Sequence, residues 1–281
     1  MERIGVIGGG LMGSGIAEVC ARAGSDVVVH EINAEAAEAA LGRIEKSLAR
    51  AIEREKLDEA GRDDLLSRID ISTDISDQAD RQLVIEAATE NESLKKDIFA
   101  ELDRVTGPDA ILASNTSSIP ITRLAAATDR PGKVVGLHFF NPVPVMALVE
   151  LVTTVLTDDD AAEAVASYAE SLGKTVIRAK DRAGFIVNML LIPYMIGAVR
   201  MFEAGFASAE DIDAGMKLGA NHPMGPLELA DFVGLDTTKY VADVLFEEFK
   251  DPAYASPPLL TRMVEAGLHG RKSGRGFYDY R

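Results

Sequence analysis

The feature that most constrains this chain is a glycine-rich turn close to its start. Residues 8–15 read GGGLMGSG, directly after an apolar run at 4–7 and at the start of an amphipathic stretch from about 11 to 23. A turn of this spacing between a strand and a helix is typical of a dinucleotide-binding fold. The glycines let the backbone turn tightly and approach a pyrophosphate over the helix N-terminus. We therefore expect the cofactor to contact Gly8, Gly10, Leu11, Met12 and Gly13.

An acidic residue stands where such a fold needs one. The next apolar run, 27–30, is followed by Glu31, and a carboxylate about 20 residues beyond the turn can accept the ribose 2′-hydroxyl of NAD. The same carboxylate would repel the additional phosphate of NADP, and Ile32 and Asn33 supply no arginine to hold it. The sequence favours NAD over NADP. The alternative is a glycine turn used only for packing, with Glu31 as a surface charge.

Short β-branched runs alternate with longer amphipathic stretches over the first two thirds of the chain. A long helix is expected at about 34–54, and further strands are expected at 83–86, 111–113, 134–138, 148–152 and 175–178. This alternation predicts an α/β fold with a mostly parallel sheet. From Phe185 to Phe202 the sequence predicts one long apolar helix, and helical periodicity continues beyond it. We expect a Rossmann-type NAD-binding domain at 1–182, followed by an all-helical domain at 183–281.

The composition argues against several classes of protein. Among 281 residues, 47% are hydrophobic and 26% are charged, which is typical of a globular protein. The formal net charge of -16 repels polyanions and argues against binding to nucleic acid or to anionic membranes. No apolar run approaches the ~18 residues that span a bilayer, and no signal peptide is expected before the first strand. The single cysteine, Cys20, predicts a buried and inert thiol, and we expect a cytoplasmic protein.

A basic stripe interrupts this acidic composition. On the helix expected at 34–54 and at its end, four basic residues repeat every three or four positions and share one face with Ser47: they are Arg43, Lys46, Arg50 and Arg54. Such a stripe could hold the phosphates of a nucleotide-like substrate handle, of the kind that coenzyme A presents. The alternative is a solvated face on which these residues pair with Glu45, Glu53 and their neighbours.

Several longer motifs identify a family by their resemblance to it. They are ASNTSSIPIT at 113–122, GLHFFNPVPVM at 136–146, DRAGFIVNMLL at 181–191, GANHPMGPLELADFVGLDTT at 219–238 and GRKSGRGFYDY at 270–280. Together they resemble the monofunctional 3-hydroxyacyl-CoA dehydrogenases, including bacterial 3-hydroxybutyryl-CoA dehydrogenases, over essentially the whole chain. The resemblance implies an oxidoreductase that interconverts a short-chain (S)-3-hydroxyacyl-CoA and the 3-oxoacyl-CoA with NAD. It also implies a homodimer formed through the helical domain.

The resemblance assigns roles to individual residues. His138 matches the family's catalytic base and Glu150 its acidic partner, while Ser117 and Asn188 match residues that position the substrate. The residues that match NAD contacts are Glu90, Lys95, Asn115, Ser117, Asn141 and Lys272, and those that match coenzyme A contacts are Ser47, Arg54 and Ser117. Arg54 stands where we expect a lysine, which keeps the charge but changes the geometry of a phosphate contact.

The central pair also makes chemical sense without the family. An alcohol carbon that loses a hydride needs a base for its hydroxyl proton, and imidazole titrates near working pH. His138 ends a predicted parallel strand, on the side of the sheet where open α/β folds bind ligands. Glu150, at the end of the next apolar run, can accept the other ring N–H and stabilise the imidazolium. The remaining histidines lack comparable partners in the sequence, and no cluster of ligands predicts a metal site.

Two other functions are compatible with parts of the sequence. A dehydrogenase of a free sugar acid, of the gulonate type, shares the NTS and His-x-x-Asn-Pro elements, but it has no use for a basic coenzyme A stripe. The second is a non-catalytic NAD-binding protein, against which the joint presence of Ser117, His138, Glu150 and Asn188 argues. Both fatty acid degradation and the reduction of acetoacetyl-CoA in butanoate metabolism agree with the motifs.

Overall fold

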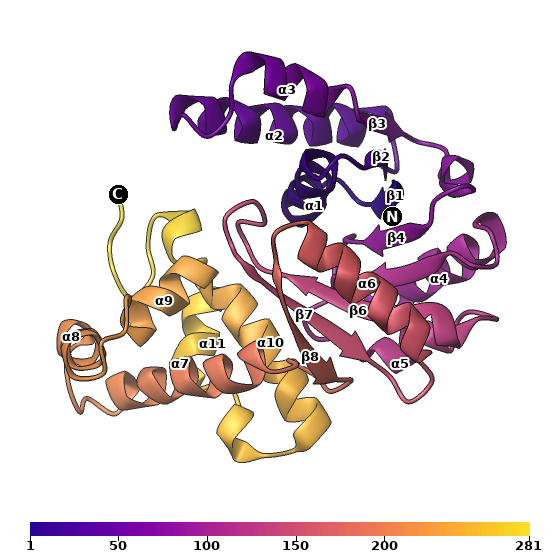
Figure 1. Ribbon diagram of the computed structural model, residues 1–281. Helices are drawn as coiled ribbons and strands as arrows, with labels where there is room; N and C mark the ends of the chain where they lie inside the picture. The colour runs from indigo at the N-terminus through magenta and orange to yellow at the C-terminus, as the bar shows by residue number, and fades with distance from the viewer. The chain divides into compact units, whose positions relative to one another are not determined.

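The computed structural model describes all 281 residues, which divide into two compact units, Met1–Asp181 and Arg182–Arg281 (Figure 1). The first unit contains every strand of the sheet, and the second is built from helices. The predicted fold class, a Rossmann-type α/β unit followed by a helical unit, is confirmed. No helix in either unit has both the length and the apolar character needed to cross a membrane.

The strands of the first unit form one sheet in the order β3-β2-β1-β4-β5-β6-β7-β8. Only β6 and β7 pair antiparallel, so the expectation of a mostly parallel sheet is confirmed. The strands are β1 Arg3–Ile7, β2 Asp26–His30, β3 Ile69–Ser72, β4 Leu83–Glu86, β5 Ile111–Ser114, β6 Val134–Phe139, β7 Leu148–Thr153 and β8 Thr175–Lys180. The sequence analysis does not predict β3, a four-residue strand at the edge of the sheet.

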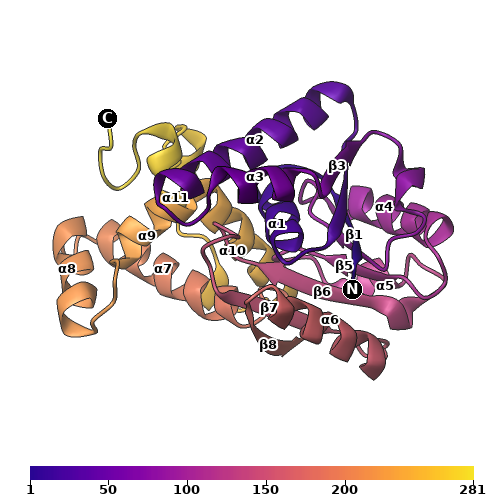
Figure 2. The same ribbon diagram turned by 45° about the horizontal axis from the view of Figure 1, so that its top comes forward.

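Helices cover both faces of this sheet. They are α1 Leu11–Arg22, α2 Ala34–Glu53, α3 Glu59–Leu66, α4 Glu92–Val105, α5 Ile121–Ala125 and α6 Asp159–Ser171, with short 3₁₀ turns at η1 Ile75–Gln78 and η2 Pro131–Lys133. Buried side chains of α1, α2 and α6 form one core with alternate strand residues such as Val6 and Leu137. Gly136, which points the other way, packs against Ile121 of α5. Figures 1 and 2 both show α2 and α3 lying alongside each other.

Helix capping distinguishes α1 from the next three helices of the chain. Asn33, Asp58 and Asn91 cap α2, α3 and α4, because the side chain of each accepts a backbone N–H of the first turn. Helix α1 begins at Gly10 without any side-chain cap. The N–H groups of its first turn therefore remain available to an anion from outside the chain.

The second unit is a bundle around its own core. Its helices are α7 Val187–Glu203, α8 Ala209–Gly219, α9 Pro226–Val233, α10 Leu235–Phe249 and α11 Pro258–Glu265, with 3₁₀ turns at η3 Pro252–Tyr254 and η4 Arg271–Ser273. Buried residues of α7, including Met195 and Ile196, pack against α9, α10 and α11. The predicted helix begins at Val187 rather than at Phe185, because Phe185 has a φ of 48° and cannot belong to a right-handed helix.

Candidate active site

The three glycines of the turn differ in the space around them. At two of them the backbone leaves no room for a side chain, and at the third there is open space that a dinucleotide could occupy. Gly8 has a φ of 90°, and an added Cβ there would lie 3.0 Å from the carbonyl oxygen of Ala87. At Gly13 a Cβ would lie 1.7 Å from the carbonyl oxygen of Gly8, so only glycine lets α1 pack this closely on β1. At Gly10 a Cβ would meet nothing within 4 Å. Open space therefore adjoins the uncapped start of α1, and the turn fits the pyrophosphate of NAD.

Glu31 belongs to this turn and is not an isolated surface charge. Its Oε1 accepts a hydrogen bond from the backbone N–H of Gly9 at 2.6 Å, and its Oε2 accepts one from Ile32 N at 3.3 Å. The carbonyl oxygen of Gly9 in turn accepts hydrogen bonds from Ser14 Oγ at 2.7 Å and Arg43 Nη1 at 3.1 Å. Three side chains thus hold the Gly9 peptide, and the Glu31 carboxylate lies beside the glycines.

The histidine and glutamate expected to form a pair do so. His138 on β6 lies directly opposite Glu150 on the antiparallel strand β7, and Nδ1 of the histidine is 2.7 Å from Oε2 of the glutamate. Glu150 is fully buried and His138 is 6% exposed, while the ring of Phe140 packs against the imidazole at 4.6 Å between centroids. Burial excludes water from the pair and strengthens its charge-assisted hydrogen bond.

The loop that follows β5 is held close to this pair by polar contacts. Oδ1 of Asn115 accepts a hydrogen bond from the backbone N–H of Phe139 at 2.9 Å, immediately after His138. Glu90 Oε1 accepts hydrogen bonds from Ser117 N at 3.2 Å and Ser118 Oγ at 2.9 Å, as well as from the Thr116 hydroxyl. The loop is thereby tied to β6 on one side and to the loop after β4 on the other. Ser117 itself is half-buried.

A buried ion pair that the sequence analysis misses supports Glu90. Lys95 is 1% exposed, and its Nζ lies 2.6 Å from Oε1 of Glu86, which is fully buried at the end of β4. The same ammonium lies 3.3 Å from Oε2 of Glu90, and Glu86 Oε2 accepts a hydrogen bond from Ser114 Oγ at 2.6 Å. Lys95 therefore has a role within the protein, and its contact with NAD stays a prediction. Sequence spacing could not pair Lys95 with Glu86, because a helix face and a strand end meet only in the fold.

Asn141 lies at the same end of the sheet as His138, in the loop that joins β6 to β7. It is exposed, and its peptide bond to Pro142 is cis. Lys174, which is nearly buried at the start of β8, donates from Nζ to the carbonyl oxygens of Val143 at 2.6 Å and Met146 at 2.9 Å. The sequence analysis misses this lysine, since no motif contains it. Lys174 fixes the loop that carries Asn141.

The structure divides the basic stripe of α2. Arg43 reaches back to the glycine turn, whereas Lys46, Arg50 and Arg54 are exposed and form no ion pair with Glu45 or Glu53. The structure therefore does not show the alternative, in which the basic residues of this face pair with acidic residues of the same helix. Ser47 is half-buried on the same helix. The roles of Ser47 and Arg54 toward coenzyme A stay predictions.

Two of the predicted site residues lie in the second unit. Asn188 is half-buried in the first turn of α7. Lys272 lies in η4, and its Nζ is 2.6 Å from the carboxylate of Asp236 at the start of α10. The tail beyond it is held by Asp231, a fully buried residue whose carboxylate accepts the backbone N–H groups of Phe277 at 3.0 Å and Tyr278 at 2.9 Å.

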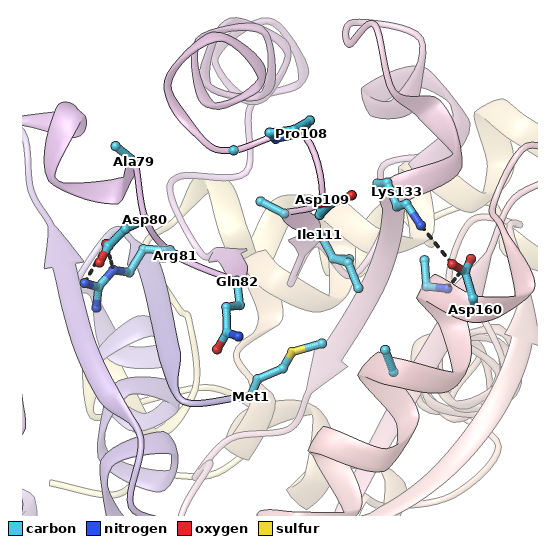
Figure 3. A pocket seen from close by; sticks show the side chains of 14 residues that line it. Met1, Ala79, Asp80, Arg81, Gln82, Pro108, Asp109, Ile111, Lys133 and Asp160 are labelled. Atoms are coloured by element: carbon cyan, nitrogen blue, oxygen red, sulfur yellow. Dashed lines mark hydrogen bonds and ion pairs between the residues drawn. The ribbon is translucent and has the colours of Figure 1, made fainter.

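A hollow of about 490 Å³ lies at the opposite edge of the sheet from His138 (Figure 3). Its lining includes Met1, Gln82, Ile111 and Lys133, which precede or begin β1, β4, β5 and β6. Ligands of open α/β sheets bind at the carboxyl ends of the strands, and this hollow faces the amino ends. Its cations are already paired, as Figure 3 shows for Lys133 with Asp160. We assign no function to it.

Comparison with known proteins agrees with this arrangement. Residues 3–182 match the model of the 3-hydroxyacyl-CoA dehydrogenase NAD binding domain, and residues 184–280 match the C-terminal domain of the same family. A 3-hydroxybutyryl-CoA dehydrogenase of Mycobacterium tuberculosis is 58% identical over 282 residues, covering 100% of this chain and 99% of the relative. The expected cofactor of the first unit, NAD, is confirmed by the first match.

Solved structures show the same similarity. The crystal structure of FadB2 from M. tuberculosis matches with a TM-score of 0.99 at 58% identity, covering 100% of this chain and 99% of that one. The (S)-3-hydroxybutyryl-CoA dehydrogenase PaaH1 from Ralstonia eutropha matches with a TM-score of 0.96 at 48% identity and the same coverage. Two family models that together match nearly every residue, and relatives of this identity, leave one conclusion. The chain belongs to the 3-hydroxyacyl-CoA dehydrogenase family.

Proposed function

We propose that this protein interconverts (S)-3-hydroxybutyryl-CoA and acetoacetyl-CoA, with His138 as general base and acid and Glu150 as its partner. The observation that carries the proposal is the buried contact of 2.7 Å between His138 Nδ1 and Glu150 Oε2 at the carboxyl edge of β6. Relatives and solved structures that match the whole chain are named 3-hydroxybutyryl-CoA dehydrogenases, which supports the short acyl chain.

In the oxidative direction the residues of this chain act on the hydroxyl proton. Glu150 holds the proton on Nδ1 of His138, so that Nε2 is the nitrogen that takes the proton of the 3-hydroxyl group. The imidazolium that forms is stabilised by the buried carboxylate. NAD, when it is bound, supplies the hydride acceptor. In the reductive direction His138 returns the proton to the forming alkoxide.

The loop after β5 supplies the second part of the proposed site. Ser117 can donate its hydroxyl to the substrate oxygen, and the contacts of Glu90 with the Ser117 and Ser118 backbone and side chain keep this loop in place. We assign Asn115, Asn141, Glu90 and Lys95 to the surroundings of NAD, in agreement with the family motifs. Asn188 and Lys272 of the helical unit keep their proposed roles toward substrate and NAD.

The exposed basic residues of α2 are the proposed contact for coenzyme A. Arg54, together with Arg50 and Lys46, offers cations that no carboxylate of the chain neutralises within 4.0 Å. Their guanidinium and ammonium groups can bind phosphate. A sugar-acid dehydrogenase would leave these cations without a function.

Purified protein given acetoacetyl-CoA with NADH, and separately with NADPH, tests the proposal through the loss of absorbance at the NADH band. Preferential oxidation of NADH supports reaction class, thioester substrate and cofactor together. Turnover of a free sugar acid in place of the thioester would favour the gulonate-type alternative. Tight binding of NADH without turnover of any thioester would favour a non-catalytic protein.

We also propose that the protein forms a homodimer through its helical unit. Leu190 on α7, Phe206 and Leu218 are large apolar side chains that are 71%, 78% and 87% exposed. Large apolar side chains that are exposed in the monomer can become buried in an interface with a second copy of the chain. Light scattering coupled to size exclusion decides the point, since a mass of one chain, 30.1 kDa, would contradict a dimer.

A further inference from the structure

Arg43 is set apart from the other basic residues of α2. It lies on the helix face that packs over the glycine turn, where the side chain of Ala40, one turn earlier, lies so close to Gly9 that an added Cβ would be 2.4 Å from the Ala40 methyl group. Its Nη1 donates to the carbonyl oxygen of Gly9 at 3.1 Å. Gly9 is the residue between the two glycines that frame the pyrophosphate position. Arg43 is therefore a neighbour of the dinucleotide turn.

The turn lacks any other positive charge of its own. The segment 8–15, GGGLMGSG, contains no basic residue, and the nearest charged side chain that bonds to it is the carboxylate of Glu31. A pyrophosphate placed over the start of α1 would meet backbone N–H groups but also the negative charge of Glu31. The chain as a whole carries a net charge of -16. A local cation has the largest effect in such surroundings.

The guanidinium of Arg43 has capacity to spare. It uses one of its five N–H donors on Gly9, it is exposed, and no carboxylate lies within 4.0 Å to neutralise it. An arginine with four unused donors in a planar fork matches phosphate oxygens well. The hydrogen bond to Gly9 orients the guanidinium and so reduces the conformational entropy that Arg43 would lose on binding a phosphate.

We propose that Arg43 binds the pyrophosphate of NAD and supplies the cation that the glycine turn lacks. The proposal rests on the use of NAD argued above. It removes Arg43 from the coenzyme A stripe, which then consists of Lys46, Arg50 and Arg54. Binding of the cofactor, and not binding of the thioester, is the property that Arg43 controls.

The test compares two side chains that bond to the same carbonyl oxygen. Arg43→Gln removes the charge and can keep an N–H donor, whereas Ser14→Ala removes a neutral donor to Gly9 and leaves the charge. The Kd of NADH is measured from its fluorescence at low and high salt, and the Kd of ADP by calorimetry. Since hydrogen bonds to charged groups contribute more than neutral ones, we expect Arg43→Gln to weaken both ligands about tenfold or more. We expect a smaller loss for Ser14→Ala.

The dependence of NADH affinity on salt distinguishes an electrostatic contact between Arg43 and the cofactor from mere support of the Gly9 backbone. The affinity of the natural protein for NADH is expected to fall with salt more steeply than that of Arg43→Gln, and Arg43→Lys is expected to restore part of the loss. Arg50→Gln is expected to leave the NADH Kd unchanged and to raise the KM of acetoacetyl-CoA.

Several results would overturn the role of Arg43. Equal losses and equal salt slopes in Arg43→Gln and Ser14→Ala would make Arg43 a support of the Gly9 carbonyl only. An unchanged NADH Kd with a raised KM of acetoacetyl-CoA would return Arg43 to the stripe. Absence of NADH binding in the natural protein would contradict the proposed function itself, and so it is distinguishable from a failure of Arg43 alone.

Discussion

His138 and Glu150 face each other directly across the only antiparallel strand pair of the sheet, with Nδ1 and Oε2 2.7 Å apart. Both side chains point to the face of the sheet opposite the core that α1, α2 and α6 form with Leu137 and Phe139. The carboxylate can accept hydrogen bonds but cannot donate one, so it fixes the proton of the imidazole on Nδ1. The proposed role of Nε2 in proton transfer requires this position of the ring proton.

A double-mutant cycle tests whether the two residues act as one unit. His138→Gln removes the proposed general base and is expected to lower kcat about 10²- to 10⁴-fold, while the Kd of NADH stays nearly unchanged. Glu150→Gln, which keeps an acceptor but loses the charge, is expected to cost less. The double variant should be no slower than His138→Gln alone if Glu150 acts through the histidine, as we propose. Turnover is measured by stopped flow. If the fold losses in kcat of the two single variants multiply in the double variant, the two residues do not act as a dyad.

Glu31→Gln is expected to weaken the discrimination against NADP. The amide can still accept the N–H of Gly9, so the turn is kept while the negative charge that repels a 2′-phosphate is removed. We expect the ratio of kcat/KM for NADPH to that for NADH to rise about tenfold, which corresponds to about 1.4 kcal/mol. Glu35→Gln, at an exposed acid in the first turn of α2, is the matched control. A ratio unchanged by Glu31→Gln would assign cofactor choice to other residues.

Two adjacent lysines of α4 give a matched pair for stability. Lys95→Met leaves the buried carboxylate of Glu86 without its cation and is expected to cost about 3–5 kcal/mol of unfolding free energy. Lys96→Met breaks a half-exposed pair with Glu92 and is expected to cost less than about 1 kcal/mol. Urea unfolding of both variants measures the difference. Similar midpoints for the two variants would show that the buried pair does not stabilise the fold.

Cys20 is expected to be inert in the native protein. It is fully buried, and burial raises the pKa of its thiol from 9.0 to about 12, so almost no thiolate forms at neutral pH. Ellman's reagent should react with unfolded protein at once and with native protein only as fast as it unfolds, with no acceleration between pH 7 and 8. Because the folded state retains this proton longer, the thiol lowers stability as pH rises from about 9 to 12. Rapid native labelling would contradict the burial.

Motifs next to strand ends could be placed from the sequence alone. The glycine turn and Glu31 each follow a run that predicts a strand, His138 ends such a run, and parallel strands bring their carboxyl ends to one side of the sheet. The sequence therefore predicted that these residues would lie along one edge of a sheet. The pairing of His138 with Glu150 has a different origin, because β6 and β7 are neighbouring runs joined by a short loop and pair antiparallel, which places the two residues opposite each other.

Contacts that depend on how separate elements pack together could not be predicted. Lys95 meets Glu86 only after α4 packs on the sheet, and Lys174 meets the carbonyl oxygens of Val143 and Met146 only after β8 pairs with β7. Arg43 shows the same limit, since the spacing along α2 groups it with Arg50 although its guanidinium turns to Gly9. Strand β3 was not predicted because its alternation of apolar and polar side chains, Ile-Asp-Ile-Ser, extends over only four residues.

The strand order also sets a length. From β2, which carries Glu31 at its end, to β6, which carries His138, the sheet takes four steps through β1, β4 and β5. Neighbouring strands lie roughly 4.8 Å apart, so the carboxyl ends of β2 and β6 are separated by about 19 Å. A ligand that contacts both Glu31 and His138 must lie extended across the carboxyl ends of the strands, with adenosine at one end and the reacting ring at the other. ADP is too short to extend from Glu31 to His138. It should therefore compete with the dinucleotide without occupying the position of the reacting carbon.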